Sequence, residues 1–427
     1  MSAPHQRALN FLNKLFEQYS FDALVARLRP KVGVANKIPR YPYIQPLAVE
    51  KRWTRLGLSL EARAQLLDPQ TEGQMKRYER NVENFIGTVK LPVGLAGPLR
   101  VNGLFAQGDY VVPLATTEAA LVASYSRGAQ LITAAGGCSA MLLNEGVSRA
   151  PGFAFRDLIE VGGFVQWVVG QLEALRAAAE ATTRHGKLVD MRVTVEGNHV
   201  YLTFDYTTGD AAGQNMVTIA TDAVCQHILT HSPVKPQYSF VEANLSGDKK
   251  ASALSFLGVR GKKVSAEVRL SAALVEETLH TSPAQMVNYW RMSAIGGVLS
   301  GTLGVQGHYA NGLAALYIAC GQDAACVAES AVGVTRFEVT DDGGLYAAVT
   351  LPNLIVGTVG GGTGLPSQTA CLEILGLAGS GHARALAEVC AALALAGELS
   401  IIGALAAGHF TRAHQNLARG KSNEHTE

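Results

Sequence analysis

The sequence has little net charge and few charged residues. Its 36 basic and 35 acidic residues give a formal net charge of +1, and only 17% of all residues are charged. Proteins that bind nucleic acid non-specifically need a basic surplus to displace counterions from the phosphates, so this balance argues against that class. The hydrophobic fraction of 48% is too high for a disordered chain and predicts a large buried core.

Regularly spaced cysteines are also lacking. The six cysteines stand at positions 138, 225, 320, 326, 371 and 390, and none forms a C-x-x-C motif. Such scattered cysteines in apolar segments are typical of buried thiols in a reducing compartment, not of a disulfide framework. His227 and His231 are spaced for one helix face, but no third ligand accompanies them, so we predict no metal site.

The apolar segments do not resemble a signal peptide or a membrane span. Residues 8–17 have helical spacing with polar interruptions, unlike a signal peptide. The most apolar region, 383–407, is rich in alanine and contains Glu388 and Glu398. We therefore predict two tightly packed helices there, in a soluble cytoplasmic protein without a membrane partner.

A length of 427 residues allows two or three domains. Residues 151–241 read as strand, long helix, two strands, helix and strand, which is the split β-α-β-β-α-β order of ferredoxin-like domains. We predict a helical N-terminal region over 1–80, a large α/β domain split between 81–150 and 242–427, and a small domain over 151–241. In the second part of the large domain we expect a helix near 266–279 and a strand pair near 336–350. The fold class is then α+β.

Two carboxylates stand among small apolar side chains. Asp323 lies in the Ile318–Ala325 run, and Glu118 lies between Ala115 and Ala119–Ala123. A charge in such surroundings needs a cation, hydrogen-bond donors or a proton. Lys249 and Lys250 follow Asp248, so the chain also offers cations for a site that polarises a carbonyl and moves protons. Ordinary buried ion pairs would explain each acid equally simply.

Two glycine-containing segments could approach a phosphate closely. Gly209–Asn215 ends a strand and opens a helix, where free amides favour a pyrophosphate, although an N-cap without ligand has the same pattern. Gly357–Gly364 lacks the G-x-G-x-x-G spacing of a dinucleotide fingerprint and could also be a tight turn. Thr183 and Arg184, after the long helix, could hold a further phosphate or simply be solvated.

Taken together, several segments resemble the 3-hydroxy-3-methylglutaryl-CoA (HMG-CoA) reductase family. They follow the family order from about residue 80 to 420, which is most of the chain. The Asp-Lys-Lys and long glycine-cluster forms resemble the class I catalytic domain. The matching segments are 83–87, 92–98, 114–118, 122–128, 208–215, 248–250, 317–325, 357–363, 398–400 and 406–409. The membrane anchor of eukaryotic members has no counterpart here.

The resemblance implies an NADPH-dependent oxidoreductase of the mevalonate pathway of isoprenoid biosynthesis. Such an enzyme reduces HMG-CoA to mevalonate and coenzyme A by two hydride transfers. The small domain would bind NADP(H) and the large domain coenzyme A. The enzyme would be a homodimer or a dimer of dimers, with active sites between subunits. There are two alternatives. One is the same reductase chemistry on a different acyl-CoA thioester, and the other is a non-catalytic paralogue that binds coenzyme A or a nucleotide.

The resemblance also assigns catalytic roles. Lys249 would stabilise the oxyanion formed at the thioester carbonyl, and Asp323 would join Lys249 and Glu118 in one hydrogen-bonded network. Glu118 would donate a proton in the aldehyde step, and His414 would protonate the coenzyme A thiolate.

Binding roles follow from the same matches. The residues implied in cofactor binding are Thr183, Arg184, Asp210, Gly213, Gln214, Asn215, Gly360, Gly361 and Gly362. Those implied in substrate binding are Ser124, Arg127, Arg149, Asp248, Lys250 and Asn311. The chain departs from the family at Glu242, where a serine is usual, and at Met292, where a lysine is usual, so the acyl group remains open.

Overall fold

The computed structural model describes residues 4–31, 33 and 37–408 of the chain. The chain divides into two compact units, Met1–Gly87 and Thr88–Glu427. The first unit is helical and has a small core of its own around Val49, Trp53 and Phe85. Its elements are α1 (His5–Gln18), α2 (Phe21–Leu28), α3 (Pro46–Leu56), α4 (Leu60–Leu66), α5 (Pro69–Gly73) and the 3-10 helix η1 (Met75–Tyr78).

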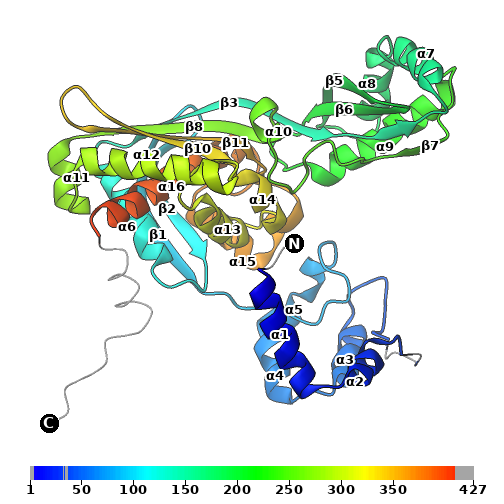
Figure 1. Cartoon of the computed structure of the whole chain (residues 1–427), viewed down its shortest axis with the longest axis horizontal. Helices are drawn as coiled ribbons and strands as arrows, with labels where there is room; N and C mark the ends of the chain where they lie inside the picture. The colour runs from blue at the N-terminus through cyan, green and yellow to red at the C-terminus, as the bar shows by residue number, and fades with distance from the viewer. Residues whose placement is uncertain (1–3, 32, 34–36, 409–427) are drawn as a thin grey trace. The chain divides into compact units, whose positions relative to one another are not determined.

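The second unit is built on one large mixed sheet (Figure 1). Its 11 strands follow the order β7–β4–β6–β3–β8–β11–β10–β9, with β1, β2 and β5 joined beside that path. β1 pairs with β3, and β9 with β10, in parallel, whereas the other pairs are antiparallel. The strands are β1 (Val93–Gly103), β2 (Gln107–Ala115), β3 (Cys138–Arg149), β4 (Gly152–Ala154), β5 (Lys187–Glu196), β6 (His199–Thr207), β7 (Tyr238–Phe240), β8 (Gly261–Leu270), β9 (Gly304–Val305), β10 (Gly333–Val339) and β11 (Leu345–Leu354).

Helices cover one face of this sheet, with α16 at the centre of the core. The helices are α6 (Leu121–Ala134), α7 (Leu158–Val168), α8 (Leu172–Glu180), α9 (Gln214–His231), α10 (Leu254–Leu257), α11 (Ala272–Leu279), α12 (Pro283–Ser300), α13 (Tyr309–Ala319), α14 (Val327–Ser330), α15 (Pro366–Ile374) and α16 (Ala383–Ala406). Two 3-10 turns, η2 (Ala324–Cys326) and η3 (Gly361–Gly364), complete the unit. The predicted mixed α+β class is confirmed.

The prediction of two helices over 383–407 is wrong, because α16 is a single helix of 24 residues. Both of its glutamates are fully buried, and each finds donors from distant loops. Glu388 accepts the backbone N–H groups of Leu104, Phe105, Ala106 and Leu142, and Glu398 accepts those of Gly307 and His308. These hydrogen bonds replace the water that would solvate the two carboxylates. The helix can therefore continue through both buried glutamates. By length and composition α16 could cross a membrane, but 83% of its most apolar window is buried inside the fold.

Two further elements differ from the prediction. The helix expected at 266–279 begins only at Ala272, because residues 261–270 form β8, where buried and less buried side chains largely alternate. The long helix expected after the first strand of residues 151–241 is two helices, α7 and α8, which Gly170 and Gln171 separate.

The close packing of α6 on α16 depends on Gly128. A Cβ at residue 128 would overlap the carbonyl oxygen of Ala396. Gly128→Ala should therefore lower the free energy of unfolding by about 3 kcal/mol, because the helix backbones must separate. Gly162→Ala in α7 is the control, since nothing lies within 4 Å of a Cβ there. Chemical denaturation followed by circular dichroism would contradict this view if both variants had the same midpoint.

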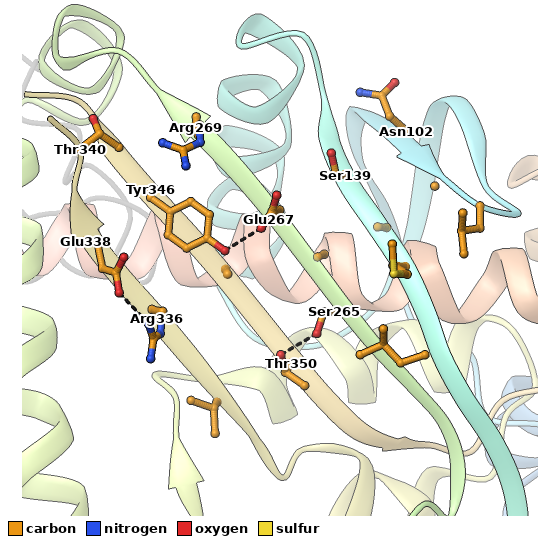
Figure 2. Close-up of a pocket in the computed structure, with 18 of the residues that line it drawn as sticks. Asn102, Ser139, Ser265, Glu267, Arg269, Arg336, Glu338, Thr340, Tyr346 and Thr350 are labelled. Atoms are coloured by element: carbon orange, nitrogen blue, oxygen red, sulfur yellow. Dashed lines mark hydrogen bonds and ion pairs between the residues drawn. The ribbon is translucent and has the colours of Figure 1, made fainter. Parts of the chain in front are cut away.

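The other face of the sheet is open along β3, β8, β10 and β11. A depression of about 1070 Å³ lies over it, lined by both polar and apolar side chains, and some of the polar ones pair with one another (Figure 2). Tyr346 donates to Glu267 at 2.6 Å, and Ser265 and Thr350 share a hydrogen bond of 2.7 Å. None of the residues predicted to bind substrate or cofactor lines this depression.

Candidate active site

Lys249 and Asp323 form a direct ion pair. Lys249 lies in the loop between β7 and α10, and its Nζ is 2.7 Å from Oδ2 of Asp323. The hydrogen bond to Asp323 raises the pKa of Lys249 above its ordinary value. Burial alone would raise the pKa of Asp323, but the hydrogen bonds from Lys249 and from the Ala325 N–H outweigh it and lower this pKa. At neutral pH the pair is therefore an ammonium facing a carboxylate.

Within a single chain, apolar side chains do not enclose the two acids. The side chains of Lys249 and Asp323 are each 41% exposed, and Glu118 is exposed as well. Asp323 caps η2 at the surface of the unit by accepting the Ala325 N–H, and its small neighbours Ala324 and Ala325 are exposed too.

Glu118 has a different partner from the one expected. Both of its carboxylate oxygens lie 3.1 Å from Nδ2 of Asn311. Among the described residues, no hydrogen bond joins Glu118 to Lys249 or Asp323. Within one chain the structure thus contains the Lys249–Asp323 pair and the Glu118–Asn311 pair, but not the single network of three.

Four predicted residues line one pocket of about 440 Å³: Glu118, Ser124, Arg127 and Asn311. Ser400, a fully buried residue of α16, organises its floor. Its hydroxyl shares a hydrogen bond of 2.8 Å with Ser124 and accepts one of 2.8 Å from Arg127. The sequence reasoning did not single out Ser400 as a site residue, although it belongs to the matched 398–400 segment. The pocket combines a carboxylate, a guanidinium and an apolar wall, which suits a ligand with both polar and apolar parts.

Arg149 and Asp248 belong to a buried ion cluster. Nη1 of Arg149 lies 2.9 Å from Asp248 and 3.4 Å from Glu242, and Arg149 is only 6% exposed. Glu242 also accepts the Ala150 N–H and the Ser246 hydroxyl, so the unusual residue at this position has a structural role. Lys250 is exposed and donates to the carbonyl of Asp248 at 2.8 Å.

The sequence reasoning also missed Arg260 and Glu329. Arg260 joins this cluster through a bond of 2.6 Å to Asp248, and Glu329 is bound to Arg260. Glu329 stands among small apolar neighbours, as Asp323 does, so the same sequence signal could have identified it.

Three predicted segments meet at one place. Ala211 forms a parallel bridge with Val359, which joins the 208–215 segment to the glycine cluster at 357–364. The Gly357 N–H donates to Gln322 at 2.8 Å, which adds the 317–325 segment. A Cβ on Gly357 would collide with the backbone of Ala212, so the close contact explains this glycine.

Among the described residues, no side chain caps the beginning of α9, so its first backbone amides are open to a ligand. Its N-cap, Gly213, has φ +79° and provides no side-chain cap. Thr183 donates to the sulfur of Met216 at 3.0 Å, which places the 183–184 loop beside this helix end. Arg184 and Asn215 are exposed. Asp210, in contrast, is occupied, because its carboxylate accepts the N–H groups of Gly381 and Ala383.

The turn at Gly360 and Gly361 is exposed. Both glycines have positive φ, and nothing lies within 4 Å of a Cβ added at either position. Gly362 instead packs against the backbone of Gly321.

His414, the predicted proton donor, lies outside the described residues. Within the described part of the chain, no group of three or more His, Cys, Asp or Glu side chains is arranged to hold a metal ion.

The sequence is similar to known reductases over most of its length. The family model for hydroxymethylglutaryl-coenzyme A reductase matches residues 48–419. The 3-hydroxy-3-methylglutaryl-coenzyme A reductase of Methanothermobacter thermautotrophicus is 45% identical over 343 residues, covering 80% of this chain and 86% of that protein. The enzyme of the same name from Aeropyrum pernix is 42% identical over 405 residues, covering 92% and 93%.

The fold has a counterpart among solved structures. It matches the class II 3-hydroxy-3-methylglutaryl-CoA reductase from Streptococcus pneumoniae bound to NADPH, with a TM-score of 0.63. That match covers 85% of this chain and 100% of the other, at 21% identity. On the family match and these identities, the chain belongs to the hydroxymethylglutaryl-coenzyme A reductase family.

Proposed function

We propose that this protein reduces HMG-CoA to mevalonate and coenzyme A, with two molecules of NADPH consumed per molecule of substrate. The observation that carries the proposal is the Lys249–Asp323 pair, in a chain that shares the reductase family over most of its length. An ammonium that a neighbouring carboxylate keeps charged is suited to a reaction in which negative charge develops on a carbonyl oxygen.

Lys249 acts on the thioester carbonyl. As hydride reaches the carbonyl carbon, the oxygen becomes an oxyanion, and the ammonium stabilises it by charge and hydrogen bonding. Asp323 holds the ammonium in place and keeps its pKa high. The same ammonium serves again when the aldehyde carbonyl is reduced.

Two groups handle the remaining protons. His414 protonates the thiolate of coenzyme A when the hemithioacetal collapses, so the thiolate cannot add back to the aldehyde. Glu118 donates a proton during aldehyde reduction, and Asn311 orients its carboxyl group through the bonds of 3.1 Å.

The residues near α9 fit a dinucleotide. Free amides at the helix start suit a pyrophosphate, and the exposed Arg184 beside Thr183 suits the 2′-phosphate that distinguishes NADPH from NADH. The turn at Gly360–Gly361 leaves backbone amides accessible near this place. When bound, NADPH supplies the hydride for both reductions. The pocket lined by Ser124, Arg127 and Asn311 would take part of the acyl-CoA substrate.

The domain division extends this proposal. We assign residues 151–241 to a ferredoxin-like NADP(H) domain, which the antiparallel order β7–β4–β6–β5 and a separate hydrophobic cluster support. Residues 81–150 and 242–427 form the large domain, and 1–80 the helical region. The six free cysteines agree with a cytoplasmic location.

A homodimer or a dimer of dimers would complete the active site. Hydride transfer to a thioester needs a site that excludes water, yet Lys249, Asp323 and Glu118 are exposed in one chain. A second subunit over these residues would provide the missing cover and could bring the two pairs together.

The activity test uses the full-length protein with NADPH and a panel of acyl-CoA thioesters. HMG-CoA should be consumed with two NADPH oxidised per coenzyme A released. Robust turnover of another thioester without activity on HMG-CoA would contradict the proposed substrate, and tight binding without any turnover would contradict catalysis.

His414→Gln should separate the two reductions. Reduction of HMG-CoA is expected to fall by about 10²-fold, because the thiolate leaves without a proton donor. Reduction of supplied mevaldehyde should change much less, because that step releases no thiolate. Equal losses in both assays would remove the assigned role of His414.

A further inference from the structure

Lys249 is held at its backbone as well as at its ammonium. Its N–H donates to Oε1 of Glu329 at 3.1 Å, and its φ is +55°. A non-glycine residue reaches this left-handed region only at a cost of about 1 kcal/mol or more, so the surrounding contacts must impose it. The N–H···Glu329 bond is one such contact.

Glu329 is itself fixed in the interior. It lies in α14, has no exposed surface, and its Oε1 also accepts Nη1 of Arg260 at 2.5 Å. The second terminal nitrogen of Arg260, Nη2, lies 2.6 Å from Oδ1 of Asp248. The consecutive residues Asp248 and Lys249 are therefore both tied to one buried ion pair, which fixes the loop that carries the ammonium.

One short segment holds Lys249 at both ends. Asp323, the N-cap of η2, forms the ion pair with the Lys249 ammonium. Glu329, in the following α14, accepts the Lys249 backbone N–H. A lysine ammonium sits on a flexible stem of four carbons. Fixing the backbone and the ammonium from the same segment restricts where that stem can place its charge.

We propose that Glu329 is a positioning residue of this reductase, which holds the backbone of Lys249 so that the ammonium stays at Asp323 and at the thioester carbonyl. The inference rests on the proposed function, because Lys249 acts on the carbonyl there. A single oxygen carries the role. Oε1 makes both bonds, whereas Oε2 is buried without a partner among the described residues.

This geometry gives two variants with opposite expectations. Glu329→Gln keeps the length and can keep an oxygen at Oε1, with its amide nitrogen at the position where Oε2 has no partner. Glu329→Asp keeps the charge beside Arg260 but draws the carboxylate back by one methylene, so it loses the Lys249 N–H. Reach therefore matters more than charge if Glu329 positions the lysine.

The Glu329→Asp variant should lose about tenfold or more in kcat, because a displacement of about 1 Å can cost up to 10²-fold. KM for NADPH should stay near the wild-type value, and Glu329→Gln should keep most of the activity. The alkaline limb of the pH profile adds a readout. Asp323, Asp248 and Cys326 raise the pKa of Lys249. If the ammonium moves away from Asp323 in Glu329→Asp, the pKa of Lys249 falls. The alkaline limb of the kcat profile then moves to lower pH.

Glu388→Gln is the control for loss of a buried carboxylate, since among the described residues Glu388 accepts hydrogen bonds only from loop and strand N–H groups. It should lower stability but leave kcat and the alkaline limb unchanged. The inference is overturned if Glu329→Asp keeps the wild-type kcat and limb, or if Glu329→Asp and Glu388→Gln lose kcat equally with no shift in the limb. If Glu329→Gln does not fold, the position of the alkaline limb in Glu329→Asp still tests the proposal. The wild-type rate on HMG-CoA tests the proposed function separately, and the variant ratios can be measured on whichever thioester is reduced.

Discussion

Lys249→Met should lower kcat for HMG-CoA reduction by about 10²–10³-fold, because methionine keeps the length of the stem but removes the charge at the oxyanion. KM for NADPH should hardly change, since Lys249 makes no part of the proposed nucleotide site. Steady-state oxidation of NADPH at saturating substrate measures the effect.

The free energy of unfolding of Lys249→Met should stay close to the wild-type value although its activity falls. The Lys249–Asp323 pair is 41% exposed on both sides, and exposed pairs contribute only about 0–1 kcal/mol to folding. Lys263→Met on β8 is the control, because among the described residues Lys263 makes no ion pair. A Lys249→Met enzyme that retains more than about a tenth of the wild-type kcat would contradict the oxyanion role.

The sequence predicted two acids for the candidate site but not their surroundings. Glu118 and Asp323 stand out because their neighbours are small and apolar, yet both carboxylates are exposed. Neighbours in sequence do not enclose a side chain that begins a turn at the surface. Enclosure depends on segments that are distant in sequence, or on another subunit.

Glu388 and Glu329, in contrast, are fully buried acids whose surroundings the sequence also did not reveal. In the sequence Glu388 suggests an interrupted helix, although it accepts N–H groups from residues more than 280 positions earlier, such as Ala106. Glu329 was not predicted as a site residue, although its small apolar neighbours resemble those of Asp323. Partners that far apart leave no trace in local composition, so the pairing of these acids could not be predicted.

The fold was predictable where periodicity was clear. The mixed α+β class, the strand pair at β10 and β11, and the strand–helix order of residues 152–240 follow from the pattern. β8 was missed although Val264, Ala266, Val268 and Leu270 alternate on the buried face, because the same residues also fit a helix start. β3 lacks clean alternation, so it gave no signal.

The meeting of the glycine segments could not be derived from spacing. Residues 211 and 359 are bridged although most of the chain between them belongs to other elements. Only the family resemblance placed both segments in one nucleotide site, and that shared role remains a prediction.

Asp323→Asn should lower kcat by about 10²-fold and also change the pH profile. Asparagine still accepts a hydrogen bond but carries no charge, so the ammonium loses the group that contributes most to its raised pKa. The pKa of Lys249 then falls toward its ordinary value, and activity is lost at lower pH on the alkaline side.

The acid limb of the pH profile tests the assignment independently. The pKa of Asp323 lies below its ordinary value in the native pair, so in the wild type this group stays ionised until the pH falls below the usual carboxylate range. Asparagine does not titrate, so any acid limb that remains in Asp323→Asn belongs to another group. Measuring kcat/KM for HMG-CoA across pH in both enzymes tests the assignment. An alkaline limb that stays in place in Asp323→Asn would show that Lys249 does not depend on Asp323 for its charge, and the pair would then be a surface contact without a catalytic role.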